Sequence, residues 1–586
     1  MKQPSHAQFG TFLAPMLALL AGCSLLIPDT SFQDAGSEID GSSLDATTPT
    51  EAGIDADVRR DASVDAFMPD AGPDETSPTV LSLFPEAGAV AVELDVQLRV
   101  VFSEDMDTST LSASSFRLSY QGEEIPGTVS YDAASRTSRF VPDEPLVLLR
   151  EYTALLTTGV ADLAGNLLTA EQRWSFVARD GRWTSPVRLD SMEQPARFTP
   201  KLMADRAGNA LAVWSTSGVT PVRLAARRYV RTDGAWQPTV ELDQGIESVS
   251  GFFSAAVNPS GSAAVAWSEA GSSRVMIRRM DTAGVWDDPV EVAPAGGSVA
   301  AEIVLALDHV GNSTIMWMEN FDLKWTRCPP SGACSPAQTL LPGLPSSSRY
   351  AQNLAVDVDQ LTNVTASWQF WDGASATRAQ AARIPSGTMW EIEDISTSSA
   401  AGGVQLSTSP DGSVTAVWRQ EDAGRQNMWA NRYELGSGWG SAQLIEVDNA
   451  NDVIEWQVTS SLLGEGLCYW SYAGSDRSYS TNRYEPGTGW RSPERIDNTE
   501  NAIALEARFG PDDNLLAVWH EWVGTVERVY SSRYQAGSGW LVPQRVDAAG
   551  ADAGSTRPSL VVGRLGRALM SWKESHGGGI WAANFD

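Results

Sequence analysis

A short stretch that returns along the chain constrains the fold more than any other feature. NRYELGSGW at 431–439 recurs as NRYEPGTGW at 482–490 and as SRYQAGSGW at 532–540. In each copy a glycine-containing turn precedes a tryptophan, and glycine permits the turns that β-hairpins require. A period of about 50 residues indicates one supersecondary unit that is repeated along the chain.

Two series of tryptophans extend this repeat over the second part of the chain. The first series ends a strand that follows a turn, and its members are Trp214, Trp267, Trp317, Trp368, Trp418, Trp470, Trp519 and Trp572. The second series follows a glycine-containing turn, and its members are Trp183, Trp236, Trp286, Trp390, Trp439, Trp490 and Trp540. In one repeat Ala333-Cys334-Ser335-Pro336 stands in place of the second tryptophan. Each unit is expected to form four strands, which is the size of one β-propeller blade.

The two ends of the repeat region complement each other. It starts with RWTSPVRLD at 182–190, a fourth strand with no first three strands before it. It finishes with GIWAANFD at 579–586, a third strand with no fourth strand after it. If both join one sheet, the propeller closes and no sheet edge is left free. We therefore expect 180–586 to form a closed propeller of eight blades, or of seven if the repeat around Cys328 is irregular.

The composition agrees with an all-β chain. Its 50 glycines and 31 prolines suit a protein that is rich in turns. The formal net charge is -31, and such a surface repels nucleic-acid phosphates, so no nucleic-acid partner is expected. With 4 histidines, the chain offers few groups for histidine-based metal or acid–base chemistry.

The N-terminus reads as an export and anchoring signal. Residues 1–22 contain a positive Lys2 and an apolar segment that is too short to span a bilayer as a helix. They end in Leu20-Ala21-Gly22, and with Cys23 this motif resembles the lipobox of bacterial lipoproteins. The resemblance implies cleavage before Cys23, lipid attachment to its thiol, and anchoring in the outer membrane or at the cell surface. The alternative is an ordinary secretory signal peptide with a chance cysteine.

Residues 23–76 have the composition of a disordered, acidic tether. They are rich in Asp, Ala, Ser, Thr, Gly and Pro, and Arg59 and Arg60 are their positive charges. Such a segment cannot bury enough apolar area to offset the entropy of ordering it. We expect an extended, self-repelling linker that holds the rest of the chain away from the membrane.

Residues 77–179 are expected to form a β-sandwich, because short strands alternate there with polar turns. They resemble the Ig-like domains of bacterial S-layer and surface proteins. The shared features are Pro85 with Gly88, the segment VFSEDMD at 101–107, Phe140-Val141-Pro142, Tyr152, the loop at 159–166, and Trp174 with Phe176. The resemblance implies a spacer or adhesion module without catalysis. Glu104, Asp105 and Asp107 either bind a structural calcium ion or form a charged turn, and the charged turn is the preferred interpretation.

The repeats resemble sialidase-type propellers in their turns. The Asp-box of those proteins is Ser-x-Asp-x-Gly-x-x-Trp, whereas Ser409-Pro410-Asp411-Gly412 places the glycine directly after the aspartate and Trp418 too far on. The resemblance therefore implies a shared architecture without the sialidase chemistry, which also needs three convergent arginines and a Tyr/Glu nucleophile pair. H-E-x-x-H, G-x-S-x-G and C-x-x-C motifs are absent from the sequence.

Arginines occupy equivalent positions in successive repeats. They are Arg228, Arg279, Arg327, Arg383, Arg432, Arg483 and Arg533. Because equivalent positions form a ring rather than one pocket, we expect each arginine to stack on a neighbouring tryptophan or to pair with an acid of the next blade.

The cysteines agree with an exported protein. Cys328 and Cys334 bracket a short loop and are the candidates for a disulfide outside the cytoplasm. Cys468 lies on a tryptophan-bearing strand and is expected to be a buried thiol.

Three residues are candidates for ligand binding. Trp371 and Trp522 lie at the exits of predicted second strands, where a tryptophan can stack on a sugar or pack in the core, and His520 is next to an acid. The expected function is a membrane-anchored, non-catalytic binding or adhesion scaffold for glycan or protein. The alternatives are a carbohydrate-active enzyme, either a glycoside hydrolase or a polysaccharide lyase, and a purely structural envelope component. No catalytic residue and no cofactor are assigned, apart from the possible structural calcium.

Overall fold

The computed structural model describes residues 74–586 except 246, 295–298, 344–349, 373–376, 386–388, 398–399, 448–450, 475–477, 497–501, 536–538, 548–553, 555 and 576–577. The regular elements of these residues are β-strands apart from two short 3-10 helices, η1 (Thr108–Thr110) and η2 (Pro511–Asp513). The prediction of an all-β chain is therefore confirmed. The predicted signal peptide at 1–22, Cys23 and nearly all of the predicted tether at 23–76 lie outside the described residues.

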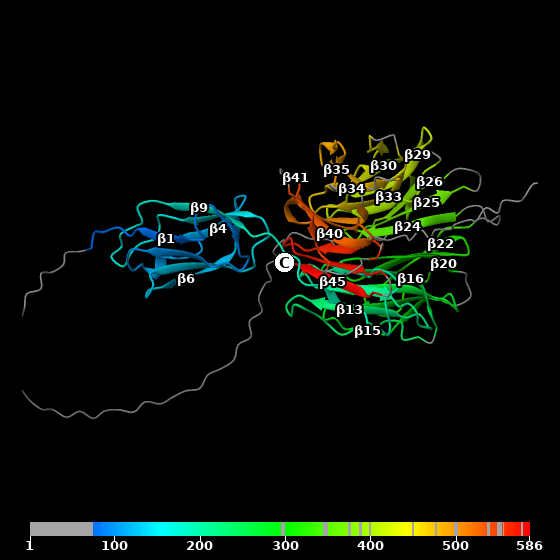
Figure 1. The fold of residues 1–586 in the computed structure, drawn as a ribbon, viewed down its shortest axis with the longest axis horizontal. Helices are drawn as coiled ribbons and strands as arrows, with labels where there is room; N and C mark the ends of the chain where they lie inside the picture. Colours follow the sequence, from blue (N-terminus) through cyan, green and yellow to red (C-terminus); the bar gives the residue numbers. More distant parts are fainter. Residues whose placement is uncertain are drawn as a thin grey trace, which may run out of the picture. The chain divides into compact units, whose positions relative to one another are not determined.

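The chain divides into two compact units, one ending at Arg179 and the other beginning at Asp180. The first unit (blue to cyan in Figure 1) has two sheets with the strand orders β1-β3-β7-β6 and β2-β9-β8-β4-β5. Its strands are β1 (Val80–Phe84), β2 (Ala89–Val92), β3 (Leu98–Phe102), β4 (Phe116–Tyr120), β5 (Glu123–Ile125), β6 (Gly127–Asp132), β7 (Thr137–Pro142), β8 (Glu151–Leu156) and β9 (Gln172–Ala178).

Aromatic side chains join the two sheets of the first unit. Phe140 on β7 lies 5.7 Å from Phe116 on β4, measured between ring centres, and Phe116 lies 6.1 Å from Trp174 on β9. All three side chains are buried. Large apolar side chains from both inner faces form the core of a β-sandwich, as expected for an Ig-like domain.

The described residues of the second unit form eight sheets (green to red in Figure 1). In seven of them the strands follow one another in chain order. The first four of these contain β11 (Lys201–Ala204), β12 (Ala210–Ser215), β13 (Leu224–Val230), β14 (Ala235–Trp236) and β15 (Val240–Glu241); β16 (Val249–Val257), β17 (Ala263–Glu269), β18 (Val275–Met280) and β19 (Val290–Ala293); β20 (Val299–Leu307), β21 (Ser313–Glu319), β22 (Asp322–Cys328) and β23 (Gln338–Leu341); and β24 (Tyr350–Val358), β25 (Val364–Trp371), β26 (Thr377–Ile384) and β27 (Glu391–Asp394).

The remaining sheets follow the same plan up to the last one. They contain β28 (Gln405–Thr408), β29 (Val414–Asp422), β30 (Arg425–Glu434), β31 (Gly438–Trp439) and β32 (Gln443–Leu444); β33 (Val453–Ser460), β34 (Gly466–Tyr472), β35 (Tyr479–Glu485), β36 (Gly489–Trp490) and β37 (Glu494–Arg495); β38 (Ala502–Phe509), β39 (Leu515–Val523), β40 (Val526–Gln535), β41 (Gly539–Trp540) and β42 (Gln544–Arg545); and β43 (Ser559–Val562), β44 (Ala568–Lys573) and β45 (Ile580–Phe585) together with β10 (Val187–Arg188).

The last sheet joins the two ends of the second unit. Val187 on β10 pairs with Ala582 on β45 in antiparallel register. The first strands of successive sheets contact one another in the order β11, β16, β20, β24, β28, β33, β38, β43 and again β11. Figure 1 shows the red C-terminal strands beside the green strands that begin this unit. The sheets therefore form a closed ring.

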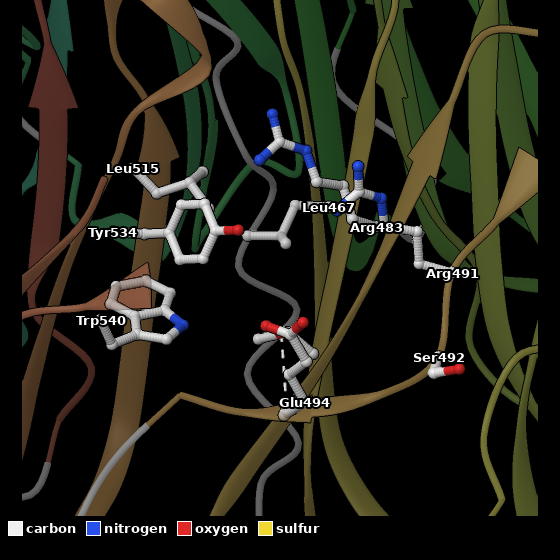
Figure 2. Close-up of a pocket in the computed structure, with 9 residues that line it drawn as sticks. Leu467, Arg483, Arg491, Ser492, Glu494, Leu515, Tyr534 and Trp540 are labelled. Carbon is white, nitrogen blue, oxygen red and sulfur yellow. Dashed lines mark hydrogen bonds between the residues drawn. The ribbon is translucent and has the colours of Figure 1, made fainter. Parts of the chain in front are cut away.

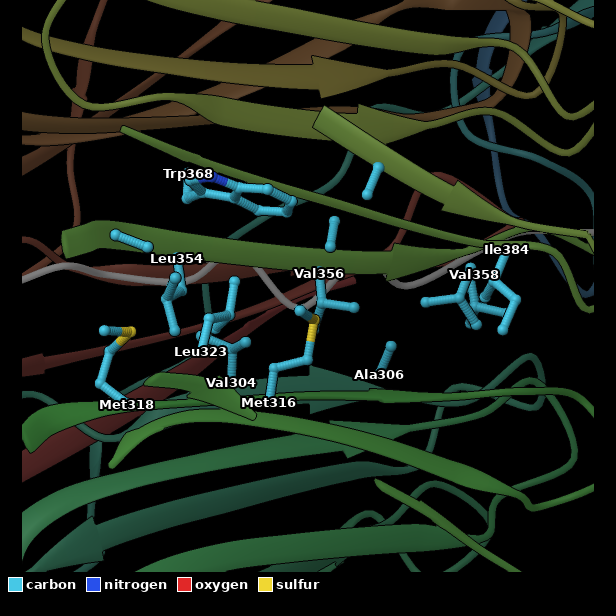
Figure 3. Close-up of a cluster of buried hydrophobic side chains, with 14 residues drawn as sticks. Val304, Ala306, Met316, Met318, Leu323, Leu354, Val356, Val358, Trp368 and Ile384 are labelled. Carbon is cyan, nitrogen blue, oxygen red and sulfur yellow. The ribbon is translucent and has the colours of Figure 1, made fainter. Parts of the chain in front are cut away.

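Large apolar side chains fill the space between neighbouring sheets. Tryptophans of the first series are among the most deeply buried residues, as Trp368 illustrates. Figure 3 shows side chains of β20 to β22, such as Met316 and Leu323, facing those of β24, such as Leu354 and Val356. Both faces of each inner strand are thereby covered, which explains why these strands are apolar along their length rather than alternating.

Four of the repeated arginines join neighbouring sheets through aromatic rings. The guanidinium carbon of Arg383 lies 4.5 Å from the centre of the Tyr433 ring on the next sheet, and that of Arg533 lies 5.3 Å from Phe585. The expected stacking on tryptophan is corrected for Arg383, Arg432, Arg483 and Arg533, because the ring that each of them contacts is a tyrosine or phenylalanine. The expected pairing with an acid of the next blade is corrected for Arg383, whose partner Asp359 follows β24 in its own repeat. Arg533 does make such a pair, with Asp180, which precedes β10 of the last sheet. The repeated motif thus links successive sheets.

Candidate functional site

A pocket lies between the sheet β33–β37 and the next sheet, β38–β42. Its lining consists of Leu467, Thr481, Arg483, Arg491, Ser492, Glu494, Leu515, Tyr534 and Trp540. The space beside its lining residues is about 330 Å³ and includes open solvent, so it is not the volume of an enclosed cavity. Leu467 and Leu515 are buried, so the inner part of the pocket is apolar.

Two aromatic rings form the side of the pocket that belongs to β38–β42. Tyr534 pairs with Trp540 across the hairpin between β40 and β41. The two ring centres are 5.5 Å apart at an interplanar angle of 63°. Figure 2 shows both rings on one side of the gap, with the indole nitrogen of Trp540 directed toward the other side. Among the described residues, no hydrogen-bond partner of this indole N–H is found, so the donor is open to a ligand.

Polar side chains form the opposite side of the pocket (Figure 2). Arg491 makes an ion pair with Glu485, and this hydrogen bond raises the pKa of the arginine. Ser492 and Glu494 are exposed. Within the part of the chain that the structure describes, the Glu494 carboxylate has neither an ion-pair partner nor a hydrogen-bond donor. It remains a strong acceptor at the pocket mouth.

Arg483 connects the two sides of the pocket. Its Nε donates to Glu465 Oε2 over 2.7 Å, and its guanidinium carbon lies 5.7 Å from the centre of the Tyr534 ring. Burial raises the pKa of Glu465, while the hydrogen bond and the charge of Arg483 act in the opposite direction. Arg483 is therefore held in place by a carboxylate and an aromatic ring.

The charged residues of the pocket occupy positions at which the repeats differ. The residues directly after the second-series tryptophans are Thr184, Gln237, Asp287, Glu391, Gly440, Arg491 and Leu541. Those four positions after the same tryptophans are Val187, Val240, Val290, Asp394, Gln443, Glu494 and Gln544. A cation and an acid coincide at these two positions only in the repeat that starts at Trp490. Sequence reasoning missed this pair, although comparison of the repeats position by position contains the signal.

The chemistry of the pocket is suited to binding. Of its lining residues, Glu494 is the one carboxylic acid, and none is a histidine or cysteine. Hydrolysis of a glycosidic bond normally uses two carboxyl groups that flank the bond. The described lining therefore combines aromatic stacking with hydrogen bonding, without an evident acid–base pair.

His520 lies in the interior of the second unit, where a ligand has no access to its side chain. Its side chain is fully buried on β39, and burial lowers its pKa from 6.5 to about 4. The nearest carboxylate oxygen, Oε2 of Glu527, lies 3.9 Å from Nδ1. The expectation that His520 contacts a ligand is corrected, because neighbouring sheets cover both faces of β39 and take up the side chain.

Trp371 and Trp522 lie on two different sheets, and neither lines the pocket. Trp371 is half-buried at the end of β25, and Trp522 is 45% exposed near the end of β39. The structure thus does not bring the predicted ligand-binding residues together. A role in binding remains a prediction for the two tryptophans.

The second unit contains one disulfide and one free cysteine among its described residues. Cys328 and Cys334 form a disulfide. Cys468 is a buried free thiol, and burial raises its pKa. A buried thiol of raised pKa is a poor nucleophile and acts as a small apolar side chain.

An acidic cluster lies in the first unit. Oxygen atoms of Asp74, Glu104 and Asp162 lie within 4.8 Å of one another. Burial raises the pKa of Glu104, as do the charges of Asp162 and Asp74. The other two calcium candidates are used elsewhere: Asp105 lies 3.4 Å from Nε of Arg136, and Asp107 accepts a hydrogen bond from the Ser109 backbone. Exposed acidic groups commonly gather without a metal, so the charged turn stays the prediction and a structural calcium ion its alternative.

Comparison with known proteins identifies the first unit. Residues 74–178 match the model of the bacterial Ig-like domain. The prediction of an Ig-like domain is confirmed. A search of curated proteins finds no match to the chain.

Solved structures that resemble the chain include propeller-type lectins. The BP39L lectin from Burkholderia pseudomallei is 12% identical, with a TM-score of 0.42, and the match covers 56% of this chain and 94% of that chain. The Aleuria aurantia lectin in complex with alpha-methyl-L-fucoside is 14% identical, with a TM-score of 0.30, over 51% of this chain and 97% of that chain. A protein of unknown function from Dyadobacter fermentans is 12% identical, with a TM-score of 0.35, over 69% of this chain and 98% of that chain.

The described residues contain no helix with the length and hydropathy of a membrane span.

Proposed function

We propose that the chain is a non-catalytic carbohydrate-binding scaffold whose binding site is the pocket between β33–β37 and β38–β42. The observation that carries the proposal is the position of Trp540 opposite the unpaired carboxylate of Glu494. One side of the pocket offers two aromatic rings inclined to each other by 63°, and the other offers hydrogen-bonding groups.

A sugar ring fits this combination because it has two kinds of surface. Its C–H groups form an apolar face that packs on an aromatic ring, and its hydroxyls both donate and accept hydrogen bonds. Glu494 and Ser492 supply acceptors, and Ser492, Arg491 and the indole N–H of Trp540 supply donors. Ligand pockets typically combine an apolar surface with a few convergent polar groups.

A carbohydrate-active enzyme is the second candidate function. A glycoside hydrolase or lyase on this fold would need an acid–base pair next to the bound sugar. Glu494 is one such group, and no partner for it lines the described pocket. Binding without turnover needs only the groups that line the pocket, whereas catalysis would need a second acid–base group beside Glu494. A purely structural envelope role predicts that no sugar binds at all.

The proposed setting is the bacterial cell surface. Cys23 would carry the lipid that anchors the chain to the outer membrane, and 23–76 would act as an acidic tether. The Ig-like domain, resembling those of S-layer and surface proteins, would act as a spacer. We propose that the eight sheets are the eight blades of a closed propeller, because their first strands form a closed ring and β10 completes the last sheet.

Glycan-array screening of the purified chain tests the function, followed by calorimetry with the best ligand. Trp540→Ala is expected to weaken binding about tenfold or more, as for a central aromatic anchor. Trp490→Ala is the matched control, since Trp490 packs on Tyr484 in the same way as Trp540 packs on Tyr534. Its pocket side lacks the charged pair, because Gly440 and Gln443 stand there.

Three outcomes would count against the proposal. Absence of binding to every glycan on the array would favour the structural role. Binding that survives Trp540→Ala but disappears in Trp371→Ala or Trp522→Ala would move the site to those residues. Turnover of a bound glycan would establish the enzyme.

A further inference from the structure

We infer that this pocket selects neutral sugars and rejects acidic ones such as uronic acids. The inference rests on the proposed carbohydrate-binding function and concerns the chemical class of the ligand. Four features of the pocket carry it: the partners of its two arginines, the state of Glu494, the balance of charge, and the open donor on Trp540.

The partners of the arginines come first, because an acidic sugar needs a free cation. Arg483 is bound to Glu465, with 2.7 Å between Nε and Oε2, and its Nη2 lies 3.4 Å from the backbone oxygen of Asp513. Arg491 makes an ion pair with Glu485. A ligand carboxylate would therefore have to compete with a carboxylate that is already in place on each guanidinium.

Glu494 adds a charge of the wrong sign for an acidic ligand. Its carboxylate is exposed at the pocket, and none of the described residues pairs with it. Counting the two arginines against Glu465, Glu485 and Glu494 leaves a formal charge of about -1 around the pocket. Like charges brought together in an interface are strongly unfavourable, whereas a sugar hydroxyl donates readily to a carboxylate.

The remaining groups suit a neutral ligand. The indole N–H of Trp540 points toward the polar side of the pocket and can donate to a hydroxyl or ring oxygen (Figure 2). Trp540 and Tyr534 can pack on the apolar face of the sugar ring regardless of its charge. The aromatic side would thus provide affinity, and Glu494 with the two neutralised arginines would determine the charge selectivity.

The test uses matched sugars that differ in one group. Methyl glucoside and methyl galactoside, which carry CH₂OH at C6, are compared with the corresponding uronides, which carry a carboxylate at C6. All four sugars are first screened on one array and are then titrated against the full chain by calorimetry. The neutral member of each bound pair is expected to bind at least about tenfold more tightly. The preference should weaken as salt is raised, because part of it is electrostatic.

Two variants examine the origin of the preference. Glu494→Gln removes the unpaired carboxylate, and Glu485→Gln releases Arg491, so either change should reduce the neutral-to-acidic ratio about tenfold. Glu434→Gln is the matched control, since Glu434 is the equivalent of Glu485 in the preceding sheet, where Gly440 replaces Arg491. It should leave the ratio unchanged.

The outcomes separate the inference from the function beneath it. Equal or tighter binding of the uronides would overturn the charge selectivity while leaving carbohydrate binding intact. A neutral preference that neither Glu494→Gln nor Glu485→Gln reduces would also overturn it, since the selectivity would then come from elsewhere. If neither these sugars nor any glycan on the array binds, the proposed function fails and the inference with it.

Discussion

The guanidinium carbon of Arg432 lies 4.4 Å from the centre of the Tyr484 ring, and the two residues belong to neighbouring sheets. The same guanidinium donates to Thr415 Oγ1 over 2.9 Å and to the backbone oxygen of Gly464 over 2.7 Å. Tyr484 in turn packs against Trp490, with 5.7 Å between ring centres. The repeated Arg-Tyr and Gly-Trp motifs therefore meet across the boundary between sheets and hold the sheets together.

Removing this stack should destabilise the second unit. Arg432→Met leaves buried acceptors without their donor and is expected to lower the free energy of unfolding by about 2–3 kcal/mol. In a double-mutant cycle with Tyr484→Leu, the coupling energy should be about 1 kcal/mol, the range of a partly buried cation–π pair. Denaturant unfolding of the full chain measures both quantities.

Arg425→Met is the control for this prediction. Arg425 lies on the same strand as Arg432, but its side chain is 48% exposed and 4.0 Å from Asp452. An exposed pair of this kind contributes little, so its replacement should hardly change unfolding. Strictly additive losses in the Arg432/Tyr484 cycle would contradict the proposed link between sheets.

Acidification should destabilise the fold through His520. Burial lowers its pKa from 6.5 to about 4, so the folded protein keeps the ring neutral where the unfolded chain takes up a proton. The contribution to stability is complete above pH 6.5 and is lost as the pH falls toward 4, by at most about 3 kcal/mol.

His520→Met isolates this effect, because Met318 occupies the equivalent position after Trp317. Unfolding of both proteins by denaturant is compared between about pH 7 and pH 4.5. The difference in stability between the two pH values should be smaller for the variant. An unchanged difference would show that other groups govern the acid sensitivity.

The pocket chemistry should be transferable to the preceding boundary between sheets. Trp490 and Tyr484 already form an aromatic side there, and Ser441 matches Ser492. Gly440→Arg with Gln443→Glu would add the missing charged pair. A β-carbon on Gly440 would meet its nearest atom at 3.5 Å, an ordinary contact, so the first change fits the backbone.

Calorimetry of this double variant should show the number of bound sugars per chain rising from one to two. The reverse change, Arg491→Gly with Glu494→Gln, is the control and should abolish binding. If the number of bound sugars stays at one, the inner apolar residues Leu467 and Leu515 are also required for binding. Thr415 and Gly466 take their places at the preceding boundary between sheets.

Lipid attachment at Cys23 predicts a simple biochemical difference. The chain produced in a Gram-negative host should incorporate labelled fatty acid and enter the detergent phase on phase separation. Cys23→Ser should abolish both, since burial of the acyl chains at about 0.8 kcal/mol per CH₂ would be lost. If the variant still enters the detergent phase, another part of the chain binds the membrane. If the unaltered chain carries no lipid, residues 1–22 are an ordinary secretory signal.

The general fold could be predicted because its determinants are local and repeated. Turn glycines and strand-ending tryptophans such as Trp418 recur in each unit, and a strand missing at one end of the series is supplied at the other. The Ig-like domain could likewise be predicted from its pattern of strands and turns. The strands and turns of both depend on residues that are close together in the sequence.

The site could not be predicted in the same way because it forms across a boundary between sheets. Arg491 and Trp540 belong to different repeats, and although Arg491 stands out when the repeats are compared, its own repeat does not indicate that it faces Trp540. The prediction that His520 binds a ligand was wrong for a related reason. Polar residues on a strand normally face solvent, but here neighbouring sheets cover both faces of the strand. Which side chains meet between sheets is a tertiary property that periodicity does not contain.

The pairing of Val187 with Ala582 has a consequence for how the molecule is made. The backbone of Ile580 donates to Asp190, 390 positions earlier, so the early strand β10 has no partner until nearly all of the second unit has been synthesised. Contacts this distant in sequence form slowly, and an unpaired edge is prone to mispairing. The growing chain therefore carries an unpaired strand, β10, until β45 has been synthesised.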